Sequence, residues 1–282
     1  MLIRGTISSR TFQSAVAFMH GFAPELDMSQ ISAVQMAENN TLCTQQTGHQ
    51  CACTAINSEF LSTFAVPFGL RSITSRNRPA LQRIAARLGV TVGELPRLTH
   101  VFDVTMTHFC HGQAVDCLDS LFVRDAFDTI EEAGRLAVSD EVYQRFARLK
   151  IQPLLYEIAH RMKHQSDFSD MLSPKFVLYS GHDSTVEPLA AAIGVSNGNW
   201  PRYASRLVFE LYAPTNDASA DTVAGIRVLY NGQDVTRLLS FCKGVISNVC
   251  PLKAFFDFVN DSKFSGGPGQ TGYTEACKNP II

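Results

Sequence analysis

The segment Ser180-Gly181-His182-Asp183-Ser184-Thr185 places an imidazole beside a carboxyl group. It follows the apolar run 176–179 and precedes a helix-like stretch at 186–193. A buried strand, a tight turn and a helix in this order put the polar pair at the carboxyl end of a strand, where open α/β sheets bind ligands. We therefore expect a ligand site there; the alternative is that His182 and Asp183 only cap the turn.

The helix after this turn favours an anionic ligand. Ser184 and Glu187 predict a capping box at its start, and Gly194 predicts its end. The free N–H groups and the positive dipole end of such a helix attract phosphate or carboxylate. A phosphate also needs cations, and Arg4, at the end of an apolar segment, and Arg10, at the start of a helix, are candidates. Both could equally be solvated surface arginines.

Composition excludes several classes of function. The chain has 282 residues, 45% of them hydrophobic, and a net charge of -2, enough for one large domain or two modest ones. No dense Lys/Arg run predicts a nucleic-acid partner, and no apolar run of about 18 residues predicts a membrane span. The sequence contains no phosphate-binding Gly-x-x-x-x-Gly-Lys loop. We expect no cofactor.

The eight cysteines fall into three groups, which favours disulfide bonds over zinc or free buried thiols. No Cys-x-x-Cys pair occurs, and His160 and His164 fit an exposed helix face better than a metal site, so we expect no metal. Sequons at Asn39 and Asn260 agree with a lumenal or secreted location, although the segment at 1–4 is too short for a secretory signal. The disulfide candidates are Cys43, Cys51, Cys53, Cys110, Cys117, Cys242, Cys250 and Cys277.

Apolar periodicity and turn residues predict the elements that must position these groups. Helices are expected at 11–22, at 78–88, at 101–109, from 139 onward and at 252–259. No strand is expected before the first of them. Pro153 is expected to divide the helical region that begins at 139. A turn is expected at 91–95. Strands are expected at 176–179, 206–212 and 225–230, the last two forming a hairpin beside the first.

Arg4-Gly5-Thr6, Ser9-Arg10-Thr11 and Gly181-His182-Asp183 together resemble the histidine acid phosphatase family. The nearer likeness is to its 2-phosphoxylose phosphatase branch. The resemblance covers essentially the whole chain and includes the segments 107–111, 201–211, 229–236, 240–242, 250–252 and 273–277.

This resemblance implies a phosphomonoesterase. Arg4 would clamp the phosphate with Arg10 in support, His182 would contact the phosphoryl oxygens, and Asp183 would protonate the leaving alcohol. The branch implies removal of the 2-phosphate from xylose in the glycosaminoglycan-protein linkage region of proteoglycans, in the Golgi lumen or membrane. A broad-specificity acid phosphatase is the nearest alternative.

The family's nucleophile is a histidine in an Arg-His-Gly-x-Arg motif, and none of the eight histidines of this sequence stands in one. We expect the chain to begin after that motif and after the first strand of the family's sheet. A membrane anchor would then lie only on sequence preceding Met1. An alternative of another class is a catalytically inactive module that binds a phosphorylated sugar or a partner.

The expected fold class is α/β: a histidine-phosphatase-like sheet flanked by helices, formed by residues 1–38 and 151–282. A mainly helical, cysteine-bearing insertion is expected at 39–150.

Overall fold

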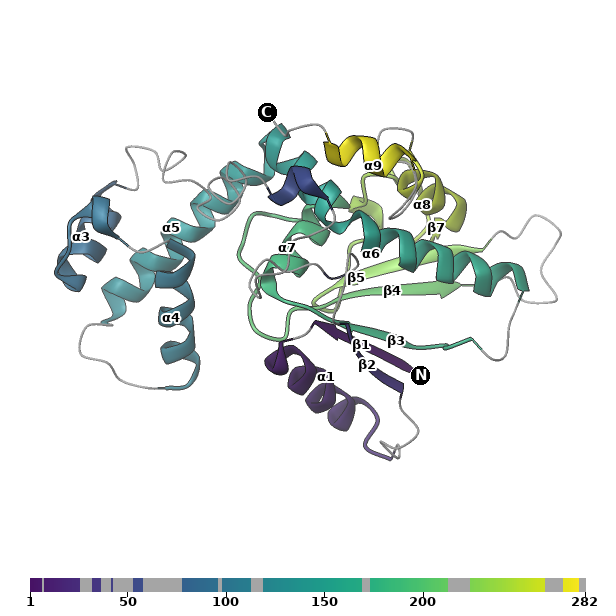
Figure 1. Ribbon diagram of the computed structural model, residues 1–282, viewed down its shortest axis with the longest axis horizontal. Coiled ribbons are helices and arrows are strands. Elements are labelled where there is room, and N and C mark those ends of the chain that lie inside the picture. Colours follow the sequence, from purple (N-terminus) through teal and green to yellow (C-terminus); the bar gives the residue numbers. More distant parts are fainter. Residues whose placement is uncertain are drawn as a thin grey trace. The chain divides into compact units, whose positions relative to one another are not determined.

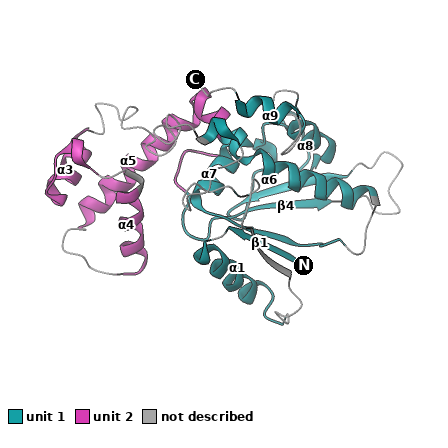
Figure 2. Ribbon diagram, in the orientation of Figure 1, with its two compact units in different colours: residues 1–57, 147–195, 201–282 teal, residues 58–146, 196–200 magenta. Residues whose placement is uncertain are grey.

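The computed structural model of the protein describes residues 1–6, 8–25, 32–36, 42, 53–57, 78–95, 98–112, 119–168, 173–212, 224–261 and 271–278 (Figure 1). They divide into two compact units, coloured separately in Figure 2. Unit 1 comprises residues 1–57, 147–195 and 201–282, and unit 2 comprises residues 58–146 and 196–200. Unit 1 combines helices and strands, as the sequence predicts for an α/β protein, whereas the described elements of unit 2 are all helical. Within these described stretches no helix combines the length and apolarity needed to cross a membrane.

The first sheet of unit 1 is parallel and has the strand order β2-β1-β3. Its strands are β1 (Leu2–Thr6), β2 (Ser32–Met36) and β3 (Val177–Ser180). Helix α1 (Ser9–Phe22) packs on this sheet through Ala15 and Met19, which surround the buried side chain of Ile3. The expectation of no strand before this helix is wrong, because β1 is paired along both edges. Pairing on two sides holds a segment too short to show strand periodicity.

A second sheet of unit 1 is antiparallel and consists of β4 (Leu207–Tyr212), β5 (Gly225–Tyr230), β6 (Gln233–Asp234) and β7 (Cys250–Pro251). The two long strands were predicted. The turn at Asn231-Gly232, both residues at positive φ, joins β5 to β6. The hairpin was expected to pair beside β3, and this expectation is wrong: the hairpin belongs to this separate sheet. The hairpin is held in unit 1 by the packing of β5 side chains against helices, and not by backbone hydrogen bonds to β3.

Besides α1, the described part of unit 1 contains four long helices. They are α6 (Glu141–Phe168), which belongs to unit 1 from Ala147 onward, α7 (Asp183–Ala192), α8 (Leu252–Val259) and α9 (Thr271–Lys278). Their shared core includes Leu155, Ile193, Ile226 and Phe255. The end of α7 at Gly194, where φ is +84°, and the span of α8 were predicted from the sequence.

Pro153 lies within α6 and does not divide it, contrary to expectation. A proline in a helix leaves the carbonyl four residues earlier without its usual N–H donor. Here that carbonyl belongs to Leu149, and the Tyr273 hydroxyl of α9 donates a hydrogen bond to it over 3.3 Å. A side chain more than 100 residues away thus replaces the lost donor, and the helix continues.

Unit 2 contains α3 (Arg78–Leu88), the short helix η4 (Val92–Glu94), α4 (Leu98–Cys110) and α5 (Ser120–Val138). Helices α3 and α4 were predicted, a turn was expected where η4 lies, and α5 was not predicted. Its start is marked by Asp119, whose carboxylate accepts a hydrogen bond from the N–H of Phe122. Ile84, Val101 and Phe122 form the buried centre shared by the three long helices.

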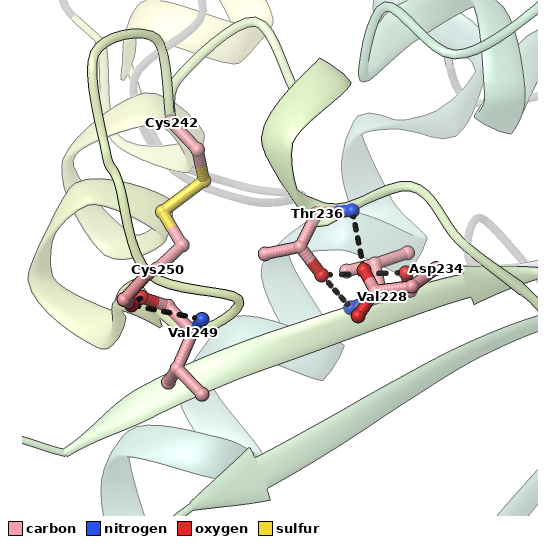
Figure 3. The surroundings of a disulfide bond; sticks show 7 residues. Val228, Asp234, Thr236, Cys242, Val249 and Cys250 are labelled. Atoms are coloured by element: carbon pink, nitrogen blue, oxygen red, sulfur yellow. Dashed lines mark hydrogen bonds between the residues drawn. A yellow bond between two sulfur atoms is a disulfide. The ribbon is translucent and has the colours of Figure 1, made fainter.

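Among the described residues of unit 1, two disulfide bonds confirm the prediction for four cysteines. Cys53, beside the short helix η3 (Thr54–Asn57), is bonded to Cys277 of α9, and Cys242 is bonded to Cys250 of β7. Figure 3 shows the second bond beside Thr236, at the start of the short helix η5 (Thr236–Leu238). Cys110 is an exposed free thiol, so its expected pairing is wrong: it lies at the surface end of α4. Cys43, Cys51 and Cys117 lie outside the described residues.

Candidate functional site

The candidate site lies where β1 and β3 end. These strands are parallel neighbours, and Gly5 is paired with Ser180. Each strand is followed by a helix, α1 after β1 and α7 after β3, so two helix N-termini begin at the same edge of the sheet (Figure 1). Such an edge combines backbone donors with the positive ends of helix dipoles.

His182 is held at this edge by a chain of hydroxyl groups. Its side chain is 8% exposed, and its Nε2 lies 3.1 Å from the Oγ1 atom of Thr6. That hydroxyl lies 2.7 Å from Thr11 Oγ1, which donates to the carbonyl oxygen of Ser8 over 2.8 Å. Because each oxygen is fixed by the next, the imidazole has one defined orientation. The arrangement joins the ends of β1, β3 and α1.

Helix α7 begins at Asp183, with His182 as its N-cap residue. The backbone N–H of His182 donates to the Thr185 hydroxyl over 3.2 Å, so the predicted capping role of Ser184 and Glu187 is wrong by two residues. A β-carbon on Gly181 would lie 2.7 Å from Thr185 Oγ1. The absence of a side chain at Gly181 therefore allows this cap to form.

Asp183 occupies the first turn of α7, where a carboxylate is stabilised by the helix dipole. Its Oδ1 atom accepts a hydrogen bond from the backbone N–H of Ser184 over 2.6 Å. The side chain is half-buried. One carboxylate oxygen is thus fixed by the backbone, beside the imidazole of His182.

The electrostatic surroundings of His182 disfavour its protonated form. Burial lowers the pKa of the imidazole most, and the positive charges of Arg10 and, more weakly, Lys150 lower it further. The Asp183 carboxylate opposes them and raises this pKa. A neutral imidazole is therefore accompanied by two cations from different helices, since Arg10 belongs to α1 and Lys150 to α6. Positive charge beside helix N-termini is the environment that binds an anion.

Arg4 lies elsewhere on β1 and has an anionic partner. Its Nη1 atom is 2.6 Å from both carboxylate oxygens of Glu157 on α6. Arg161 and the Tyr179 hydroxyl each donate to the same carboxylate over 2.9 Å. Burial raises the pKa of Tyr179, and the negative charge of Glu157 raises it further. The structure thus brings His182, Asp183 and Arg10 together, whereas the guanidinium of Arg4 is bound by Glu157.

Lys150 was missed by sequence reasoning. It stands in a helix without a motif around it, and the only signal was its spacing of seven residues from Glu157, which places both on one face of α6. Burial lowers the pKa of its ammonium group to about 8, against the opposing attraction of Asp183.

Other predicted positions carry less chemistry. The described residues hold no cluster of His, Cys, Asp and Glu able to bind a metal ion. The ring of His160, expected on an exposed face, packs against Tyr156 and Phe256, and burial lowers its pKa. Asn260 ends α8, and its amide nitrogen donates to the carbonyl of Phe256. Asn39 lies outside the described residues.

A hollow of about 240 Å³ lies in unit 2, lined mainly by residues of α3 and α5. Its two arginines are already paired with carboxylates. Arg83 binds Asp125 over 2.7 Å, and Arg87 forms an ion pair with Asp119. These carboxylates offset the positive charge inside the hollow.

Comparison with known proteins finds chains of similar sequence. 2-Phosphoxylose phosphatase 1 of Danio rerio is 31% identical over 98% of this chain and 59% of its own length. The Homo sapiens protein of that name is 30% identical over 98% of this chain and 58% of its own length. Lysosomal acid phosphatase of Bos taurus is 24% identical over 70% of this chain and 47% of its own length. The chain thus spans a little over half the length of the xylose phosphatases it matches.

The family model described as "Histidine phosphatase superfamily (branch 2)" matches residues 1–231. This range includes both strands, both helices and every side chain of the candidate site. The protein belongs to branch 2 of the histidine phosphatase superfamily.

Proposed function

We propose that the edge formed by β1 and β3 binds the phosphoryl group of a phosphomonoester. The observation that carries this proposal is the buried His182, held by Thr6 at the start of α7 and facing the charge of Arg10. The imidazole contacts a phosphoryl oxygen, while the guanidinium of Arg10 offers the planar pair of donors that matches two more. We assign the main cation to Arg10 rather than Arg4, because Arg10 stands in the first turn of α1, beyond the end of β1, whereas Arg4 lies earlier on that strand.

Asp183 is the proposed proton donor to the leaving alcohol. Its position beside His182 places a carboxyl group next to the bound phosphoryl group, where the bridging oxygen must be protonated as the ester bond breaks. The hydrogen bond from Ser184 orients one oxygen and leaves the other to carry the proton.

The family's covalent route requires a nucleophilic histidine in the Arg-His-Gly-x-Arg motif, which the printed sequence does not contain. We therefore propose that this 282-residue chain contributes the phosphate-binding and acid half of a phosphomonoesterase site. Taken by itself it binds a phosphorylated ligand without forming a phosphohistidine. Supplying the motif is the condition for turnover.

For the ligand we propose a phosphorylated sugar, specifically the 2-phosphate of xylose in the glycosaminoglycan-protein linkage region. The support is that two relatives near 30% identity are named for phosphoxylose. This substrate implies the Golgi lumen as the compartment. The similarity to lysosomal acid phosphatase supports a broader acid phosphatase specificity as the second candidate.

Calorimetric titration of the purified chain with inorganic phosphate and with xylose 2-phosphate tests these proposals. Both ligands should bind, and Arg10→Met should weaken binding by about tenfold or more, the usual effect of losing a charge-assisted hydrogen bond. Arg237→Met is the matched control, because Arg237 is exposed on η5. Failure of the unmodified chain to bind phosphate would overturn the site. Equal affinity for xylose 2-phosphate and glucose 6-phosphate would instead favour broad specificity.

Hydrolysis of p-nitrophenyl phosphate by the same material should be absent. Turnover that disappears in Asp183→Ala would contradict the non-covalent proposal and assign full activity to this chain.

A further inference from the structure

One face of α6 lies against the first sheet of unit 1. Glu157 on this face binds Arg4 of β1 and accepts a hydrogen bond from Tyr179 of β3. These two partners are themselves neighbours, since Arg4 is paired with Tyr179 across the parallel strands. Lys150 is seven residues before Glu157, which is two helical turns, so it projects from the same face.

The directions of α6 and β3 decide where this face carries Lys150. Figure 1 shows them running in opposite directions. Going back from Glu157 to Lys150 covers about 10 Å along the helix. Going forward from Tyr179 to His182 covers about 10 Å along the strand. The two displacements match, so Lys150 lies over the end of β3, where His182 and Asp183 stand.

The charges agree with this placement. The Lys150 ammonium acts on both His182 and Asp183, attracted by the carboxylate and disfavouring protonation of the imidazole. The side chain is partly buried, and burial lowers its pKa to about 8. It nevertheless remains a cation at acidic and neutral pH. A partly buried ammonium group costs stability, which is the pattern expected where function selects the charge.

We infer that Lys150 is a second phosphate-binding cation, which approaches the phosphoryl group from α6 while Arg10 approaches it from α1. This inference rests on the proposed function of the site. The two side chains differ in kind: Arg10 supplies a planar pair of donors, and Lys150 supplies a compact charge that can follow the phosphoryl oxygens. Together with the N-terminus of α7 they surround the anion from three elements.

Titration with inorganic phosphate at pH 6 tests the inference. Lys150→Met should weaken binding by about tenfold or more, because one charge-assisted contact is lost. Lys150→Arg, which restores the charge, should stay within about threefold of the unmodified protein. Lys163→Met is the matched control on the same helix. The Lys163 side chain is 44% exposed and is bound to Asp167 over 2.6 Å, so its loss should leave phosphate binding unchanged.

A labelling experiment on the unmodified protein gives a second measurement that needs no variant. Phosphate should protect Lys150, but not Lys163, from acetylation by acetic anhydride, as read by mass spectrometry. Two results separate the failures. If Arg10→Met weakens phosphate binding while Lys150→Met does not and Lys150 is unprotected, the phosphate site stands and the role of Lys150 is refuted. If the unmodified protein binds no phosphate, the proposed function fails and this inference fails with it.

Discussion

Replacing Lys150 with methionine should stabilise the protein while it weakens the phosphate site. The pKa of Lys150 falls from 10.5 to about 8 on folding, chiefly through burial and already net of the attraction of Asp183. Each pH unit between these values corresponds to about 1.4 kcal/mol. Keeping the ammonium charged in the folded protein therefore costs about 3 kcal/mol below pH 8. Methionine retains an unbranched apolar stem and carries no charge.

The pH dependence follows from the sign of this change. Between pH 8 and 10.5 the unfolded chain binds a proton at Lys150 that the folded chain has lost, so this group makes the unmodified protein more stable as the pH rises. Its cost is fully present below pH 8. The advantage of Lys150→Met should accordingly be about 3 kcal/mol at pH 6 and about 2 kcal/mol at pH 9.

Urea unfolding followed by circular dichroism at both pH values measures the two differences. Lys163→Met, at an exposed ion pair, should change the free energy of unfolding by less than about 1 kcal/mol. The reasoning would be refuted by a Lys150→Met protein that is no more stable than the original at pH 6. A gain in stability together with lost phosphate affinity is the trade-off expected of a functional charge.

Thr6→Val removes the hydroxyl that contacts His182 and should lower the free energy of unfolding by about 1 to 3 kcal/mol. The same substitution should weaken phosphate binding. Unchanged phosphate affinity in calorimetry would mean that this hydroxyl does not orient the imidazole. Tyr273→Phe removes the donor to the Leu149 carbonyl and should cost about 1 kcal/mol in urea unfolding. In a Pro153→Ala background, where a backbone N–H returns, the same change should cost less, and equal costs in the two backgrounds would contradict this account of the helix.

The strand, turn and helix around His182 could be predicted because each depends on neighbours in sequence. The start of α7 could not be fixed to the residue. Sequence pointed to Ser184 as the cap, but the helix begins two residues earlier because the Thr185 hydroxyl accepts a hydrogen bond from the N–H of His182, an approach that Gly181 allows. The prediction that Pro153 divides the helix was wrong for a different reason, since the donor that preserves the helix, the Tyr273 hydroxyl, comes from a distant segment.

The two arginines illustrate what the resemblance alone left open. Arg4 lies about 7 Å before the end of its strand, and the site lies beyond that end. Arg10 stands in the first turn of the following helix. Applying the rule that ligands bind at the carboxyl ends of parallel strands to β1 as well as β3 would have favoured Arg10 from sequence. No comparable local rule identifies Lys150, because its relation to His182 depends on how α6 lies across the sheet.

The bond between Cys53 and Cys277 makes the molecule tolerant of a broken backbone. A protease that cuts anywhere within residues 58–146 separates Arg10 and His182 onto different peptides, yet each peptide retains one cysteine of this pair. The fragments should therefore migrate together in gels until a reductant is added. A nicked protein can therefore keep both halves of its phosphate site in one covalently linked molecule.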